Sequence, residues 1–324
     1  MGAFTVSGWE SKGKLSVMRQ HSRSFFRTGG IFLAIGIGLL CPSFHTVSFL
    51  IAPLLMLMLF FVFLRISAPL HTFRGSHLWL LGWNLGVGPL AYGVIRYCGG
   101  EEILALAALM AGLSPTGTAA PVVMGFLDGK VEYVILAFLI STLGMTFTLP
   151  FLLPYFLNAD TSGLTLAIFQ SLGGIVFIPL FSALTLRKWW PPARQWYRKT
   201  QNFTFLLWIT TLCLMVANAS YFLHQNSTSW VILLEILGVT GLICLSNFGM
   251  GYLFGGKEFP HECSQALGQK NTSLTFYIAI TYASPAVALG PCMYILWHNL
   301  WNALQMAIHQ EPAEKTAEKS PPTP

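Results

Sequence analysis

Two short polar segments interrupt long apolar stretches of the chain, and both carry side chains able to bind an ion or a small polar molecule. Residues 114–121 read Ser-Pro-Thr-Gly-Thr-Ala-Ala-Pro, and residues 266–273 read Ala-Leu-Gly-Gln-Lys-Asn-Thr-Ser. Each proline removes a backbone donor and opposes helix continuation. A simple kink accounts for the prolines but leaves Ser114, Thr116 and Thr118 unexplained. At membrane depth, irregular backbone persists only where protein or a water-filled cavity satisfies its polar groups, so both segments are candidates for an internal binding site.

The composition places these segments in a membrane. Of 324 residues, 54% are apolar and 9% are charged, against roughly 25% charged in an ordinary soluble domain. The mean hydropathy is +0.61. Because a helix of about 20 apolar residues crosses the ~30 Å hydrocarbon core, we predict an all-α polytopic membrane protein with about ten transmembrane helices. This composition argues against a soluble enzyme fold, a nucleic-acid-binding domain and a secreted disulfide scaffold.

The apolar runs divide the chain into a basic N-terminus, two halves of five spans each and a polar tail, at residues 1–24, 25–157, 158–308 and 309–324. The expected spans are residues 25–41, 45–65, 77–97, 101–127, 132–157, 163–186, 202–223, 229–256, 264–284 and 286–308. The tail is rich in Glu, Lys and Pro and is predicted to be disordered. Lys and Arg collect in alternate loops, which by the positive-inside rule places both termini in the cytoplasm of a plasma (inner) membrane protein. These charges form no continuous basic stripe, so we expect no nucleic acid partner.

The two polar segments occupy corresponding places, since each falls in the fourth span of its half. A duplicated unit with an odd number of spans inserts with opposite orientation in its second copy, which predicts an inverted repeat with broken spans 4 and 9. Paired interrupted helices in corresponding positions indicate the binding site of a secondary transporter. The sequence offers no nucleophile–base pair at membrane depth and no cysteine spacing typical of a metal site. We therefore expect no enzyme, no cofactor and no bound metal.

Several motifs resemble those of the bile acid:sodium symporter family over nearly the whole chain. Residues 115–119, Pro-Thr-Gly-Thr-Ala, resemble the family's Pro-Gly-Gly-Thr-Ala signature, and residues 268–271, Gly-Gln-Lys-Asn, resemble its Gly-x-Gln-Asn signature. Residues 41–44, 51–58 and 127–131 are similar to the family's first loop, second span and a later turn. The resemblance implies a panel domain from spans 1, 2, 6 and 7, a core domain from spans 3–5 and 8–10, and spans 4 and 9 crossing at their breaks. It also implies an organic anion as substrate.

The chain departs from this family at the positions of its sodium ligands. Where sodium-binding members carry oxygen-bearing side chains, the resemblance aligns Ala120, Pro121, Val134, Phe138, Ala266 and Lys270. Hard cations prefer oxygen ligands, and unit charges 4 Å apart repel by about 4 kcal/mol at an effective dielectric of 20. The usual two-sodium coupling is therefore not expected. We hypothesise that the Lys270 ammonium supplies the missing positive charge at the crossing.

Lys270 also has a structural interpretation, an ion pair with Glu235, the only acidic residue deep in the eighth span. Protonation of that carboxylate would then make a proton the coupling ion. The resemblance matches Asn84 to a Gln that precedes proline in the third span. It matches His298 and Asn299 to a polar pair that lines the substrate cavity in some relatives, although a histidine bonded inside the bundle is an equal alternative. The predicted substrate contacts are Thr116, Thr118, Asn84, Asn271, Thr272, His298 and Asn299.

These features together predict a secondary transporter that moves an organic anion across the lipid bilayer by alternating access. Lys270 and Glu235 are the candidates for coupling. The alternative is a membrane sensor or interaction protein that keeps the fold without transport. The loss of both cation sites favours this alternative.

Overall fold

The computed structural model describes residues 29–318, apart from residue 31 and the ranges 66–69, 159–160 and 226–229. The regular elements of these residues are helices, which confirms the all-α prediction. Their bounds are η1 Pro42–Leu50, α2 Ile51–Arg65, η2 Leu70–Thr72, α3 Ser76–Tyr97, α4 Glu102–Gly112, α5 Ala120–Phe126, α6 Val131–Phe156, α7 Thr161–Trp189, η3 Pro191–Gln195, α8 Trp196–Gln225, α9 Trp230–Gly255, α10 Pro260–Gly268, α11 Thr272–Tyr282 and α12 Pro285–Glu318.

Six helical segments among the described residues are long and apolar enough to cross a membrane. They are Pro42–Leu64, Ser76–Tyr97, Val131–Phe156, Gly163–Trp189, Asn202–Gln225 and Trp230–Gly255. The helix α4 is apolar but shorter. The prediction of a polytopic membrane protein is confirmed at this level, whereas the count of ten spans and the inverted repeat stay predictions.

Two of the expected spans are each divided into a pair of helices. α4 and α5 replace a continuous span over residues 101–127, and α10 and α11 replace one over residues 264–284. Pro121 lies in the first turn of α5, and Pro260 begins α10. A proline fits the start of a helix because the N–H that it lacks has no partner within the helix there. The chain therefore breaks where its polar and proline-rich segments predict.

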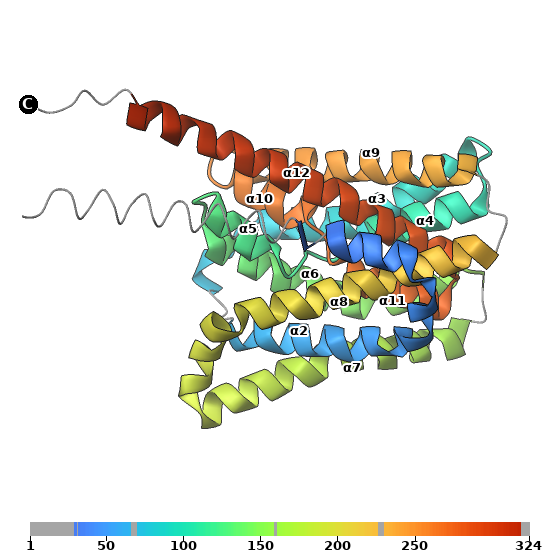
Figure 1. The fold of residues 1–324 in the computed structure, drawn as a ribbon, viewed down its shortest axis with the longest axis horizontal. Coiled ribbons are helices and arrows are strands. Elements are labelled where there is room, and N and C mark those ends of the chain that lie inside the picture. Colours follow the sequence, from blue (N-terminus) through green and yellow to red (C-terminus); the bar gives the residue numbers. More distant parts are fainter. Residues whose placement is uncertain (1–28, 31, 66–69, 159–160, 226–229, 319–324) are drawn as a thin grey trace, which may run out of the picture.

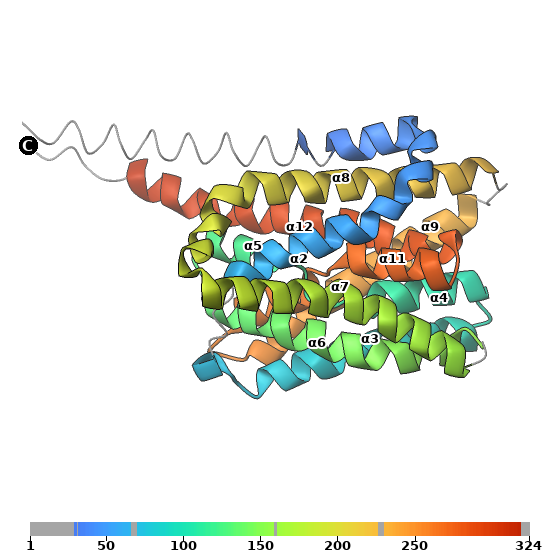
Figure 2. The same ribbon diagram turned by 90° about the horizontal axis from the view of Figure 1, so that it is seen from below.

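The helices form two groups that lie side by side (Figures 1 and 2). α2 packs against α7 and α8, and these three helices are called the panel group here. α3 to α6 and α9 to α12 pack among themselves and are called the core group. The two groups meet where α6 contacts α7 and where α12 contacts α8. The panel group holds three of the four spans that the resemblance assigns to the panel domain, and the division into panel and core domains stays a prediction.

Within the core group, α10 is held against α9 by close backbone contact. A Cβ atom added to Gly251 would lie 2.6 Å from the Cys263 carbonyl oxygen and 2.6 Å from the Ser264 Cα atom. The Ser264 hydroxyl also donates a hydrogen bond of 2.7 Å to the Phe248 carbonyl oxygen. Small residues allow this approach between membrane helices, where packing rather than water drives association. This contact fixes the position of α10, the helix that precedes the second break.

The C-terminal end of the chain differs from the expected disordered tail at residues 309–324. The helix α12 continues to Glu318. Ala, Glu and Lys are frequent between residues 311 and 318, and their high helix propensity accounts for the continuation. Residues 319–324, together with the expected basic N-terminus at residues 1–24, lie outside the described residues.

Replacing Gly251 by alanine is expected to lower the free energy of unfolding by about 1–3 kcal/mol, because the added methyl group overpacks the α9–α10 contact. The measurement is the melting temperature of the purified protein in detergent. Gly249→Ala is the matched control on the same helix, since its added Cβ would meet no atom within 4 Å. Equal melting temperatures for the two variants would contradict close packing of α10 on α9.

Candidate functional site

The two breaks cross each other as antiparallel strands would. The Gly117 N–H donates a hydrogen bond of 2.7 Å to the Gln269 carbonyl oxygen, and the Asn271 N–H donates one of 2.7 Å to the Pro115 carbonyl oxygen. Thr116 and Lys270 form an isolated antiparallel β-bridge at this point. Each break thereby satisfies polar groups that the other has freed from a helix. The structure brings the two segments together as the resemblance implies.

A glycine is required at position 117 by the closeness of the crossing. A Cβ atom there would lie 2.9 Å from the Lys270 carbonyl oxygen and 3.1 Å from its carbonyl carbon. Real Cβ atoms rarely approach backbone so closely, so a side chain would push the two breaks apart. The smallest residue therefore stands at the centre of the site.

Hydroxyl groups brace the crossing from the sides. The Thr116 hydroxyl donates to the Ala266 carbonyl oxygen at 2.7 Å, and the Thr116 N–H donates to the Ser141 hydroxyl at 3.0 Å. Ser114 and Thr275 share a hydrogen bond of 2.5 Å between their hydroxyl oxygens. The Thr116 side chain, predicted as a substrate contact, is thus engaged in joining α10 to the first break. The bond between Ser114 and Thr275 joins the first break to α11, and Ser141 on α6 supports the first break.

Lys270 turns its side chain into the core group rather than toward lipid. The side chain is 3% exposed, its ammonium donates to the Asn84 side-chain oxygen, and it lies 3.5 Å from the Gly112 carbonyl oxygen. Asn84 belongs to α3 and is fully buried. Glu235 is exposed on α9, and the ion pairs of the described residues do not join it to Lys270. The alternative ion pair with Glu235 is not among these contacts, and the Asn84 amide accepts from the ammonium instead.

The surroundings of the Lys270 ammonium are those of a bound cation. Gly112 is the last residue of α4, and the carbonyl groups at a helix C-terminus carry partial negative charge that favours a cation. The Asn84 amide adds a second oxygen of the kind that hard cations prefer. Two neutral oxygens and a helix end thus hold the amine in place.

The positions that the resemblance assigns to sodium ligands are filled by apolar packing. Ala120, Val134 and Ala266 belong to one buried apolar cluster, and Phe138 belongs to another. None of their side chains offers an oxygen atom to a cation. The Ala266 carbonyl oxygen accepts the Thr116 hydroxyl instead.

A small cavity opens at the crossing, between the panel and core groups. Its volume of about 20 Å³ has room for about one water molecule. The lining residues are Met58, Gly117, Thr118, Ala119, Trp208, Gln269, Lys270, Asn271, Thr272, Ser273 and His298. Met58 lies on α2 and Trp208 on α8, so the panel group supplies an apolar wall opposite the polar breaks.

Two buried nitrogen atoms of the lining residues have no hydrogen-bond partner. They are Nδ2 of Asn271, which is 7% exposed, and Nδ1 of His298, which is 3% exposed. The helix α11 begins at Thr272, and the N–H groups of a helix N-terminus favour an anion. A cavity with these donors is suited to hydrogen-bond a negatively charged group.

The predicted site residues divide into those that line the cavity and those that do not. Thr118, Asn271, Thr272 and His298 line it. Asn84 holds Lys270, and the Asn299 amide donates to the Ile295 carbonyl oxygen of its own helix at 2.9 Å. The sequence interpretation missed Met58 and Trp208, because an apolar residue in an apolar run carries no signal. It also left out Gln269 and Ser273, although both belong to the polar segment 266–273.

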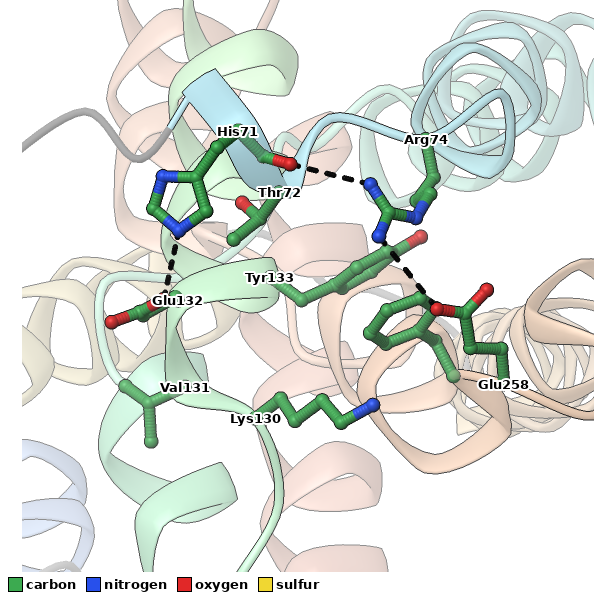
Figure 3. Close-up of a pocket in the computed structure, with 9 residues that line it drawn as sticks. His71, Thr72, Arg74, Lys130, Val131, Glu132, Tyr133 and Glu258 are labelled. Carbon is green, nitrogen blue, oxygen red and sulfur yellow. Dashed lines mark hydrogen bonds and ion pairs between the residues drawn. The ribbon is translucent and has the colours of Figure 1, made fainter.

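A larger pocket of about 490 Å³ lies between the starts of α3, α6 and α10 (Figure 3). Its wall carries Arg74 and Glu258, 3.7 Å apart, and His71 and Glu132, 3.6 Å apart. These side chains are largely exposed, and exposed pairs of this kind contribute little stability. None of the predicted site residues lines this pocket, so the crossing remains the candidate site.

Comparison with protein families identifies one matching model, described as the Sodium Bile acid symporter family, over residues 34–226. This range covers more than half of the 324 residues and includes the first break. The second break and Lys270 lie beyond its end. Comparison with curated proteins finds no match.

The Asn84–Lys270 contact is expected to appear as coupling between two substitutions. Asn84→Leu should lower the free energy of unfolding by about 2–3 kcal/mol, because it removes an acceptor from a buried ammonium. Adding Lys270→Met removes the ammonium as well, so the double variant should melt above Asn84→Leu alone. Melting temperatures of the natural protein and the three variants in detergent measure the coupling. A double variant less stable than Asn84→Leu would contradict the contact.

Proposed function

Because the chain belongs to the sodium bile acid symporter family, we propose that it is a secondary transporter of a small or amphipathic organic anion. Transport proceeds by alternating access, in which the core group moves against the panel group around the helix crossing. The protein is an integral membrane protein, as its apolar helices and its family indicate. The anion passes through the bilayer with its charged group held at the two breaks.

The observation that carries this proposal is the pair of unpartnered nitrogen atoms in a cavity between the two groups. Buried polar atoms are nearly always hydrogen-bonded, so Asn271 Nδ2 calls for an acceptor. His298 Nδ1 calls for one too in the tautomer that carries its proton on that nitrogen. A carboxylate or sulfonate supplies acceptor oxygens, and the start of α11 adds favourable charge. Met58 and Trp208 on the panel side contact the apolar body of the same molecule.

The size of the cavity implies movement. A volume of about 20 Å³ excludes an organic anion, so the panel and core groups must separate before the substrate binds. Because the cavity is lined from both groups, their relative movement opens it on one side or the other. This is the geometry that alternating access needs.

The Lys270 ammonium takes the place of a transported cation in this proposal. It is held by the Asn84 amide and the Gly112 carbonyl oxygen, and a second unit charge 4 Å away would be repelled by about 4 kcal/mol at an effective dielectric of 20. That repulsion weakens cation binding by roughly a thousandfold. The family is associated with sodium, but sodium has no part in the transport step proposed here. Proton coupling through Glu235 stays a prediction, without the contact that motivated it.

The alternative of a sensor or interaction protein that does not transport rests on the same small cavity. Such a protein binds the anion and moves none of it. Binding and flux therefore have to be measured separately, and the two experiments below do so.

Uptake of organic anions into liposomes containing the purified protein is expected to proceed equally with sodium and with potassium. Lys270→Gln restores an amide at a position where the resemblance places a sodium ligand, so its uptake should fall about tenfold in potassium and recover in part in sodium. Lys188→Gln, at the exposed end of α7, is the control for loss of a lysine. Sodium-dependent uptake by the natural protein would refute the role given to Lys270.

Binding of the anion is expected to raise the melting temperature of the detergent-solubilised protein. An anion at 100 times its dissociation constant adds about 2.7 kcal/mol, read out with a panel of carboxylates and sulfonates. Asn271→Leu removes an unpartnered donor and should abolish the shift. Asn299→Leu is the matched control, because that amide is bonded within its own helix. A shift that survives Asn271→Leu and is lost in Asn299→Leu would place the anion elsewhere.

A further inference from the structure

A row of polar side chains follows one face of α12 away from the cavity. His298, Asn302 and Gln305 are spaced four and three residues apart, so they share a helix face. At 1.5 Å per residue the row is about 10 Å long. The helix continues to His309, whose imidazole lies 3.1 Å from an Asp128 oxygen in the turn before α6. That turn is followed by Lys130. The helix α12 runs from the crossing toward the end of the molecule where α5 lies (Figure 1).

A side chain of α10 joins the row to the cavity. The Gln265 amide nitrogen donates to the Gln269 side-chain oxygen at 2.6 Å and to the Asn302 side-chain oxygen at 3.1 Å. Gln269 and His298 both line the cavity. Asn302 thus continues the polar surface of the cavity, and Gln305 follows one turn later on the same face of α12. Gln265, His298, Asn302 and Gln305 are called the α12 polar row here.

Several buried side-chain atoms of the described residues lack a hydrogen-bond partner, and three of them belong to the α12 polar row. Among the described residues, Gln265 Oε1, His298 Nδ1 and Gln305 Oε1 are buried without a hydrogen bond. An unpaired buried polar atom costs free energy that an apolar side chain of the same shape would avoid. One such atom is tolerated in many proteins, but three along one path need a common explanation.

Packing between helices explains only part of the row. The bond between Gln265 and Asn302 is an ordinary interhelical contact and would hold α10 near α12 by itself. It leaves no role for Gln305, seven residues beyond the cavity residue His298. A path that fills with water in another state of the protein gives all three unpaired atoms a partner.

We propose that the α12 polar row lines the aqueous route by which the anion passes between the crossing cavity and the end of the molecule at Asp128 and Lys130. The inference rests on the proposed function, since a route is needed only if the anion leaves the cavity. Neutral amides suit a route, because they hydrogen-bond a passing anion and its water without the tight binding that would hold it there. In the structure Gln265 is bonded to Gln269 and Asn302, and His309 lies against Asp128 beyond the row. In the proposed cycle this arrangement is the closed state of the route.

Three variants at two neighbouring positions test the row. Gln305→Met keeps the length of the side chain and removes its unpaired oxygen, whereas Gln305→Asn keeps an amide. Leu304→Met places the same methionine on the adjacent residue, which is half exposed on the outer face of the helix. Each variant is reconstituted in liposomes for anion uptake, and its melting temperature is measured in detergent with and without the anion.

Gln305→Met is expected to raise the melting temperature by about 2 °C, because the closed state loses an unpaired atom, and to lower the rate of uptake about tenfold. The melting shift caused by the anion should persist in this variant, since the cavity is intact. Gln305→Asn and Leu304→Met should transport at nearly the natural rate. Uptake by Gln305→Met at the natural rate, whatever its melting temperature, would overturn the proposed route. Loss of the anion shift in the natural protein would instead count against the proposed function.

Discussion

The exchange of two backbone hydrogen bonds between the broken helices is the constraint on which the rest of the structure depends. In hydrocarbon an unpaired N–H or C=O group costs several kcal/mol, so neither break can exist alone at membrane depth. The bonds from Gly117 to Gln269 and from Asn271 to Pro115 bring the breaks to the same place. Thr116, Lys270 and Asn271 are positioned by that meeting point, and the glycine at 117 follows from the closeness of the two backbones there.

The crossing also decides where Lys270 can reach. Because its backbone is paired with the first break, its side chain starts between α3 and the end of α4 and ends on the Asn84 amide and the Gly112 carbonyl oxygen. The same backbone leaves Asn271 and the start of α11 facing the panel group. The irregular chain at residues 269–271 thus places the Lys270 amine on one side and, on the other, the small cavity that the proposed movement would enlarge.

Local rules in the sequence were enough to predict the breaks, the all-helical membrane fold and the burial of Lys270, since proline, glycine and polar residues act within one or two turns. The partners of these residues were not predictable in the same way. Asn84 lies 186 residues from Lys270, and the sequence offered Glu235 as the alternative partner because charge is visible in a sequence and an amide acceptor is not. Thr116 and Asn299 carry the expected polar groups, but their orientation is set by the exact turn of the backbone, which periodicity does not resolve.

A cation that is part of the polypeptide has an energetic consequence for the proposed cycle. In the proposed cycle the Lys270 ammonium moves with the core group in one direction and then back. Over a complete transport cycle it therefore carries no net charge across the membrane, and only the charge of the anion is moved. No dissolved ion gradient is then spent, and the membrane voltage becomes the driving force. A voltage of about 100 mV is worth about 2.3 kcal/mol per unit charge. At that voltage, negative inside, the equilibrium concentration of a monovalent anion would be roughly fiftyfold higher outside the cell than inside. Under the proposed cycle, a voltage of this sign favours export of the anion over its accumulation.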